Sequence, residues 1–206
     1  MTESTKLSST LRYSSHWWCP HHKIDQSVCD KVIEYSEGKF REAELTSLEE
    51  TNELGQILYT DHRSRKGKVF FDEEQWIYEI VWPFMKMANK QAEWDFEITG
   101  AESYQITKSE VGDFYLPHND SLGTKGTTYI WPDNPVIHNK TRKMSMSFLL
   151  NDDFEGGDLV IHHAAEKKLE KGEMIFFPSF LTHEVKPVTK GTRYSLVVWF
   201  LGPPWR

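Results

Sequence analysis

The sequence predicts a mainly β domain of α+β type, in which N-terminal helices pack on a C-terminal β-sandwich or barrel. Two observations lead to this prediction. Apolar residues recur at helical spacing over 72–88, and from Phe96 onward that period gives way to short apolar runs separated by Gly, Asn and Asp. Many short strands with turn signals between them are typical of sandwiches and barrels. The 206 residues fit one domain, 1–206, with a sizeable core.

The first helix is predicted from Asp25 to Gly38. Asp25 is a suitable N-cap and Gly38 a suitable stop, and the apolar residues between them place Cys29 on the buried side. Residues 1–22, which precede this helix, are read as a polar N-terminal extension.

The second helix is predicted from Asp72 to Ala88, where the apolar residues follow the helical period closely. Pro83 lies inside this pattern and implies a kink or a break near Trp82. Residues 23–95 are therefore read as a helical support, with a polar connection between the helices.

The C-terminal part, residues 96–206, is predicted to form the β core. Each predicted strand is a short apolar or alternating run bounded by turn residues. The predicted strands are Glu102–Thr107, Tyr115–Asn119, Lys143–Leu150, Leu159–His162, Glu173–Phe177, His183–Val188 and Thr192–Leu201.

Two of these strands have faces of different character. Successive side chains of a strand point to opposite sides, so each strand has one mostly apolar face that can pack under the helices. The residues on this face are Met144, Met146, Phe148 and Leu150 in one strand, and Tyr194, Leu196, Val198 and Phe200 in the other. The opposite faces are predicted to line a ligand cavity, and they carry Ser145, Ser147 and Leu149, and Arg193, Ser195, Val197 and Trp199.

A candidate metal site begins with His118-Asn119-Asp120. Residues two apart on a strand point to the same side, so His118 and Asp120 can present an imidazole and a carboxylate together. His183 can supply a third ligand if the fold brings it near. Two histidines and one carboxylate form the facial triad of non-haem iron(II) oxygenases, which leaves metal positions open. By itself a His-x-Asp pair is common, and His183 alone would be an ordinary strand-end histidine.

Arg193 is a candidate partner for an anionic ligand. Thr189-Lys190-Gly191 is a turn signal, and a hairpin at this turn would return Arg193 to the neighbourhood of His183. A buried guanidinium needs an anionic partner, and a ligand carboxylate would provide one, with Ser195 donating to the same group. A structural salt bridge with an acid from another element is the alternative.

Five sequence blocks in the C-terminal half resemble the prolyl 4-hydroxylase-like branch of the iron(II)- and 2-oxoglutarate-dependent oxygenases, especially its small bacterial and viral hydroxylases. They cover somewhat under half of the chain. The blocks are V-G-D-F-Y-L-P-H-N-D (Val111–Asp120), R-K-M-S-M-S-F-L-L-N (Arg142–Asn151), F-E-G-G-D-L (Phe154–Leu159), K-G-E-M-I-F-F-P-S (Lys171–Ser179) and H-E-V-K-P-V-T-K-G-T-R-Y-S (His183–Ser195).

The resemblance implies a double-stranded β-helix, or jelly roll, with iron(II), 2-oxoglutarate and dioxygen as reactants. It implies His118, Asp120 and His183 as the iron ligands and Arg193 as the partner of the distal cosubstrate carboxylate. Many relatives carry a Tyr that contacts 2-oxoglutarate at the position of Ser109 or Leu149. Because both are absent here, Tyr104 and Ser195 are the candidates to replace that contact.

The resemblance further implies hydroxylation of a substrate C–H bond, with release of succinate and carbon dioxide and with ascorbate as a supporting reductant. The branch favours a prolyl or similar side chain of a peptide or protein, and a free small molecule is the alternative. The candidate substrate residues are Tyr115, Trp131, Arg142 and Trp199. Residues 121–141 are long for the branch and are expected to form a substrate lid or an elaborated surface loop.

Composition excludes some partners and leaves others open. The net charge is −7 and no basic stripe is evident, which argues against nucleic acid, and no apolar run predicts a membrane span. Residues 1–15 lack the apolar core of a signal peptide, so a reducing cytoplasmic setting is expected. Two further readings are a non-catalytic jelly-roll module that binds a metal or ligand, and a zinc module built from the His and Cys residues of 16–29. The oligomeric state is not predicted.

Overall fold

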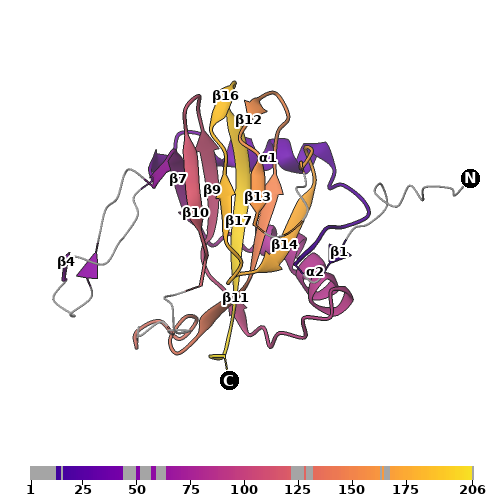
Figure 1. Cartoon of the computed structure of the whole chain (residues 1–206), viewed down its shortest axis with the longest axis vertical. Coiled ribbons are helices and arrows are strands. Elements are labelled where there is room, and N and C mark those ends of the chain that lie inside the picture. Colours follow the sequence, from indigo (N-terminus) through magenta and orange to yellow (C-terminus); the bar gives the residue numbers. More distant parts are fainter. Residues whose placement is uncertain are drawn as a thin grey trace, which may run out of the picture.

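The computed structural model describes residues 13–14, 16–43, 50–51, 57–58, 64–121, 128, 132–162, 164 and 168–205. Two antiparallel sheets face one another, and the helices α1 and α2 cover the outer face of the larger sheet (Figure 1). This is the jelly-roll arrangement with helical support that the sequence predicted.

The larger sheet runs in the order β1-β2-β14-β11-β17-β9-β7-β3, with β8 paired to β17. Its three central strands are β11, β17 and β9. Of these, β17 pairs with β11 on one side and with β9 on the other. The strands are β1 (Tyr13–Ser14), β2 (Trp17–Trp18), β3 (Arg41–Glu42), β7 (Lys68–Asp72), β8 (Gly100–Ala101), β9 (Tyr104–Ser109), β11 (Thr141–Leu149), β14 (Met174–Pro178) and β17 (Arg193–Gly202).

The smaller sheet runs in the order β13-β15-β10-β6 and closes the other side of the barrel. Two short ribbons, β12 with β16 and β4 with β5, complete the described strands. Their bounds are β4 (Glu50–Thr51), β5 (Ile57–Leu58), β6 (Arg65–Lys66), β10 (Phe114–His118), β12 (Glu155–Gly156), β13 (Leu159–Ile161), β15 (His183–Val185) and β16 (Val188–Lys190).

Helix α1 (Gln26–Ser36) has the predicted N-cap. The Asp25 carboxylate accepts a hydrogen bond of 2.8 Å from the backbone N–H of Ser27, which satisfies one of the free donors of the first turn. After the helix, Gly38 has a φ of +77°, the left-handed conformation in which glycine commonly follows a helix end. Cys29 is fully buried, as its spacing predicted.

Helix α2 (Gln75–Gln91) is continuous through Pro83, so of the predicted kink or break near Trp82 the break is wrong. Proline removes one backbone hydrogen bond, which leaves the carbonyl of Glu79 without its helical partner. Both Pro83 and Glu79 are exposed, so water can satisfy that carbonyl and the helix can continue. The buried side of the helix carries Ile77, Val81, Met85 and Ala88.

The apolar faces predicted for the central strands are confirmed. Of the opposite faces, Ser147, Arg193, Ser195, Val197 and Trp199 line the cavity, whereas Ser145 and Leu149 do not. The apolar residues of β11 and β17 form one cluster with the buried sides of both helices. Trp18 and Phe176 join this cluster, and their rings meet edge to face at 5.8 Å. The core therefore lies between the larger sheet and the helices, and the opposite face of the same sheet remains for the cavity.

Strand β7 was not predicted, and it corrects the reading of 23–95 as purely helical. It pairs with β9 over five positions, from Lys68 opposite Lys108 to Asp72 opposite Tyr104. The run is short and leads almost directly into α2, so its own pattern does not separate it from the helix. The segment forms a strand because it pairs with β9.

The predicted hairpin between the strands of His183 and Arg193 is also wrong. After β15 the chain turns at Pro187, β16 pairs with β12, and β17 then enters the larger sheet. Proline has no N–H to continue the ladder, so β15 stops before it. His183 and Arg193 consequently belong to opposite sheets, and both line the cavity between these sheets.

Candidate active site

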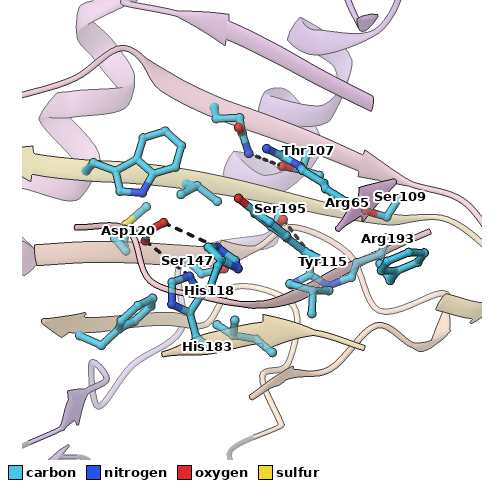
Figure 2. A pocket seen from close by; sticks show the side chains of 18 of the residues that line it. Arg65, Thr107, Ser109, Tyr115, His118, Asp120, Ser147, His183, Arg193 and Ser195 are labelled. Atoms are coloured by element: carbon cyan, nitrogen blue, oxygen red, sulfur yellow. Dashed lines mark hydrogen bonds and ion pairs between the residues drawn. The ribbon is translucent and has the colours of Figure 1, made fainter. Parts of the chain in front are cut away.

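A cavity of about 230 Å³ lies between the two sheets (Figure 2). The larger sheet contributes the inward side chains of β9, β11 and β17, and the smaller sheet contributes those of β10 and β15. In Figure 2, His118, Asp120 and His183 lie at one end of the view and Arg193 at the other.

His118, Asp120 and His183 converge at the first end of the cavity. His118 ends β10 and lies opposite His183, the first residue of β15, in the strand register. The His118 Nε2 is 3.7 Å from Asp120 Oδ1, and the His183 Nε2 is 3.5 Å from Asp120 Oδ2. One ligand atom from each residue lies within 4.8 Å of the others. In the described part of the chain, these three side chains are the group placed to hold a metal ion. The His and Cys residues of 16–29, considered above as a zinc module, do not form a group of this kind.

Backbone contacts orient both imidazoles toward this point. The Nδ1 of His118 is 2.8 Å from the carbonyl oxygen of Leu116, and the Nδ1 of His183 is 3.0 Å from that of Leu181. A carbonyl only accepts, so in each ring Nδ1 carries a proton, and Nε2 is the nitrogen that faces Asp120 and is available to a metal. Metal-binding histidines typically have this arrangement, in which a second contact sets the tautomer.

Asp120 is held by two hydroxyl groups behind it. Ser145 donates to Asp120 Oδ2 at 2.6 Å, and Ser145 and Ser179 share a hydrogen bond of 2.9 Å. Burial alone would raise the pKa of Asp120, but His183 and Arg142, together with this hydrogen bond, hold it below its usual value. The carboxylate is therefore ionised and oriented before any metal arrives.

The protonation of His118 is also suited to metal binding. Burial, and then repulsion by His183, lower the pKa of His118 to about 4. The neutral imidazole is thus the stable form near neutral pH. Neutral imidazoles and a carboxylate are the donor set of a facial iron(II) triad, so the residues present fit that metal.

Arg193 lies at the other end of the cavity, with 3% of its surface exposed. Its Nη1 donates to the Ser195 hydroxyl at 2.7 Å, and its Nε has no hydrogen-bond partner in the described part of the chain. Burial lowers the pKa of Arg193 to about 10, and the field of Asp158 partly offsets this. No ion pair with an acid lies within 4 Å among the described residues, so the guanidinium is available to a ligand carboxylate.

The turn at Gly157 packs directly on Arg193. Gly157 has a φ of +64°, and a Cβ placed there would lie 2.8 Å from the Arg193 Cδ. Only glycine avoids both the backbone strain and the steric overlap. This turn therefore helps to hold the arginine side chain in place.

Three cavity residues were not recognised from the sequence as a set: Gln105, Thr107 and Ser109 of β9. The Gln105 amide donates to the Thr107 hydroxyl at 2.8 Å, while the Gln105 Oε1 is buried without a partner. Thr107 lies opposite Ser195 and Ser109 opposite Arg193 in the strand register. Their alternation along β9 is the sequence signal that would have revealed them.

Tyr104, expected to contact 2-oxoglutarate, does not line the cavity. It is fully buried on the helix side of β9, where its ring packs on Tyr78 at 5.6 Å. The reason is the pleat: Gln105 and Thr107 face the cavity, so Tyr104 must face the helices. Ser195, the other expected contact, does line the cavity.

Three of the four expected substrate residues line the cavity, namely Tyr115, Arg142 and Trp199. The Tyr115 ring stacks on His118 with 3.5 Å between centroids. Arg142 makes a bidentate pair with Glu102, with both contacts at 2.6 Å, and its guanidinium lies 4.1 Å from the Trp199 ring centre. The fourth, Trp131, lies outside the described residues, as do residues 122–127, 129 and 130 of the expected lid.

Comparison with known proteins agrees with this site. The sequence profile of the 2OG-Fe(II) oxygenase superfamily matches residues 104–201. Related sequences include PKHD-type hydroxylases of Synechococcus sp. strain CC9902, 33% identical over 107 residues, and of Idiomarina loihiensis, 31% identical over 101 residues. These matches cover 50% and 46% of this chain, and 42% and 39% of the relatives, so the chain spans about two fifths of their length.

Solved structures share the fold over nearly the whole chain. A viral collagen prolyl hydroxylase of Paramecium Bursaria Chlorella virus-1, determined with 2OG, has a TM-score of 0.65 at 15% identity and covers 91% of this chain and 96% of its own. A prolyl hydroxylase of Trichoplax adhaerens in complex with a hypoxia-inducible-factor peptide has a TM-score of 0.59 at 17% identity, covering 90% and 83%. Residues 104–201 thus match the 2OG-Fe(II) oxygenase superfamily in sequence, and the chain shares its fold with these prolyl hydroxylases.

Proposed function

We propose that this protein is an iron(II)- and 2-oxoglutarate-dependent dioxygenase that hydroxylates a C–H bond, releasing succinate and carbon dioxide. One observation carries the proposal: a His-Asp-His group lies at one end of a cavity, and at the other lies a buried arginine that has no ion pair among the described residues. A dicarboxylate cosubstrate needs a metal at one end and a cation at the other. The family match at residues 104–201 supports the same assignment.

In this proposal the chain's residues bind and orient the reactants. His118, Asp120 and His183 hold iron(II), which supplies the open positions where 2-oxoglutarate and dioxygen are activated. Arg193 and Ser195 hold the distal carboxylate, because a guanidinium can pair with a carboxylate through two parallel hydrogen bonds. The enclosing sheets keep bulk water from the reacting atoms.

The proposed substrate is a prolyl or similar side chain of a peptide. The structural neighbours named above are prolyl hydroxylases, and one of them is bound to a peptide. Tyr115 and Trp199 line this cavity, and aromatic side chains suit contact with an apolar ring. Arg142 lines the same cavity, with its guanidinium over the Trp199 ring.

Three further expectations remain proposals. The chain 1–206 is one oxygenase domain, because the helices and the β core share a single hydrophobic cluster. It acts in the cytoplasm, with ascorbate keeping the iron reduced, and both of its cysteines are free. No helix among the described residues is long and apolar enough to cross a membrane.

The test starts with anaerobic protein, iron(II) and ascorbate. We expect 2-oxoglutarate to produce the weak visible charge-transfer band of its iron chelate, and air to start slow succinate release. His183→Ala should abolish iron binding. Arg193→Ala should retain iron but require about 10- to 100-fold more 2-oxoglutarate, since a charged hydrogen-bonded pair contributes about 1.5–3 kcal/mol.

The matched controls are His22→Ala and Arg41→Ala. Both residues are exposed and lie outside the cavity, so band and turnover should match those of the wild type. Well-folded, iron-loaded protein that shows neither band nor succinate would contradict the proposed activity and favour a non-catalytic binding module.

A further inference from the structure

The cavity has an excess of positive charge. Four basic side chains and one acidic side chain line it: Arg65, Lys66, Arg142, Arg193 and Asp120. Lys66 pairs with Asp113 at 3.2 Å, and Arg142 pairs with Glu102. Two guanidinium groups remain without a salt bridge in the part of the chain that the structure describes, those of Arg193 and Arg65.

The Arg65 guanidinium stacks on an aromatic ring and makes no hydrogen bond with another described side chain. It lies on the edge strand β6, opposite Tyr115 of β10 in the strand register. Its guanidinium carbon is 4.8 Å from the centre of the Tyr115 ring, and that ring in turn stacks on His118. Figure 2 shows Arg65 and Tyr115 between the metal-site residues and Arg193.

The stacking on Tyr115 leaves the N–H groups of Arg65 unused. A cation–π contact involves the face of the guanidinium, whereas its five N–H donors lie in the plane and point elsewhere. Unlike the Nε of Arg193, no nitrogen of Arg65 is both fully buried and unpaired, so its donors are accessible from the cavity. Burial lowers the pKa of Arg65, but arginine stays charged at neutral pH.

Charge balance in the proposed holoenzyme shows what Arg65 lacks. The two charges of iron(II) and the charge of Arg193 are balanced by Asp120 and the two carboxylates of 2-oxoglutarate. Counting only the side chains that the structure describes, Arg65 remains as one unbalanced positive charge beside the proposed metal site. A partly buried cation is most stable with an anionic partner that can accept several of its hydrogen bonds.

We propose that Arg65 binds a carboxylate of the primary substrate, so that the substrate carries one negative charge close to the hydroxylated carbon. This inference rests on the proposed function. Tyr115 holds the face of the guanidinium and orients its N–H groups, and the carboxylate accepts from two of them. The carboxylate belongs either to a free chain end, as in a small amino-acid derivative, or to an acidic side chain beside the target residue.

The test measures binding to protein loaded with zinc in place of iron and saturated with 2-oxoglutarate. One set of probes consists of N-acetyl amino acids, including N-acetylproline, and their amides. The other consists of acetyl-Asp-Pro-amide and acetyl-Asn-Pro-amide. Affinities are measured by ligand-observed NMR for the wild type, for Arg65→Gln and for Arg41→Gln, whose arginine lies outside the cavity and also faces an aromatic ring, that of Phe71.

We expect at least one carboxylate probe to bind about tenfold or more tightly than its neutral partner, because the pair includes a charged hydrogen bond. This preference should disappear in Arg65→Gln and persist in Arg41→Gln. Preference among the N-acetyl acids would assign the carboxylate to a free chain end. Preference for the Asp dipeptide would assign it to an acidic side chain.

Three results would overturn the inference. In the first, no carboxylate probe binds more tightly than its neutral partner. A result in which none of the probes binds counts as this outcome. In the second, the preference survives in Arg65→Gln. In the third, Arg65→Gln weakens 2-oxoglutarate instead, which would make Arg65 a cosubstrate residue. Failure of the wild type to bind 2-oxoglutarate with a metal would be a separate result, which contradicts the proposed function itself.

Discussion

The two faces of the larger sheet have opposite chemistry, although the same strands form both. On β11, β17 and β9 the outer face is apolar and packs under α1 and α2. The inner face of these strands is largely polar and lines the cavity, with Arg193, Ser195, Ser147 and Thr107 among its residues. Adjacent residues in the sequence therefore serve different purposes, one in folding and the next in binding.

This difference shows how a small domain can keep a buried cation and a candidate metal site. The apolar face contributes the hydrophobic stabilisation that the polar face does not. The rigid strands also hold Arg193 at one end of the cavity and Ser145, the hydrogen-bond donor to Asp120, at the other. Substitutions on the outer face should change stability, and substitutions on the inner face should change binding.

The largest expected effect on stability comes from a pair of neighbours on β11. Phe148→Ala should lower the free energy of unfolding by about 3–5 kcal/mol, because it opens a void in a fully packed core. Ser147→Ala, on the other face, should change it by no more than about 1 kcal/mol. Urea unfolding of both variants measures this. Equal losses would break the distinction between the faces.

The metal-free cavity should be sensitive to pH in a way that the apolar face is not. The pKa of His118 is about 4 in the folded protein and 6.5 in the free side chain, so below pH 6.5 the unfolded chain binds the proton first. Stability is therefore complete above pH 6.5 and is lost as the pH falls toward 4, by up to about 3 kcal/mol.

The measurement is urea unfolding of metal-free protein at pH 7 and at pH 4.5. His118→Gln provides the control, because it removes the titrating group and should flatten the dependence in this window. A wild type as stable at pH 4.5 as at pH 7 would contradict the depressed pKa.

The hydroxyl behind Asp120 should affect metal binding more than folding. Ser145→Ala removes the 2.6 Å hydrogen bond to Asp120 Oδ2 and should weaken iron(II) binding by about 10- to 100-fold. Ser103→Ala removes a hydroxyl that donates to Glu73 outside the cavity and should leave metal affinity unchanged. Metal titration of the two variants separates these outcomes, and equal affinities would exclude an orienting role for Ser145.

The smallest expected effect compares two residues of β9. Thr107→Val removes a cavity hydroxyl and should weaken 2-oxoglutarate by about fivefold, the size of one neutral hydrogen bond. Tyr104→Phe alters the helix side and should leave this affinity within about twofold. If Tyr104→Phe weakened 2-oxoglutarate binding more than Thr107→Val does, the result would support a contact between Tyr104 and the cosubstrate.

Much of this protein follows from local patterns in its sequence. Alternation along 143–150 and 192–200 determined which side chains face the helices and which face the cavity, because the two-residue period of a strand is a local property. The spacing of His118 and Asp120 likewise determined that both point to one side. Helix α1 was predictable because its cap and its stop are encoded within a few residues.

Other features depended on contacts between distant segments, so only the tertiary structure decided them. Strand β7 exists because it pairs with β9, and His183 meets His118 because β15 pairs with β10 rather than with β17. Helix α2 tolerates Pro83 because that residue faces solvent. The inclusion of Arg65 in the cavity follows from the pairing of β6 with β10, which no local period encodes.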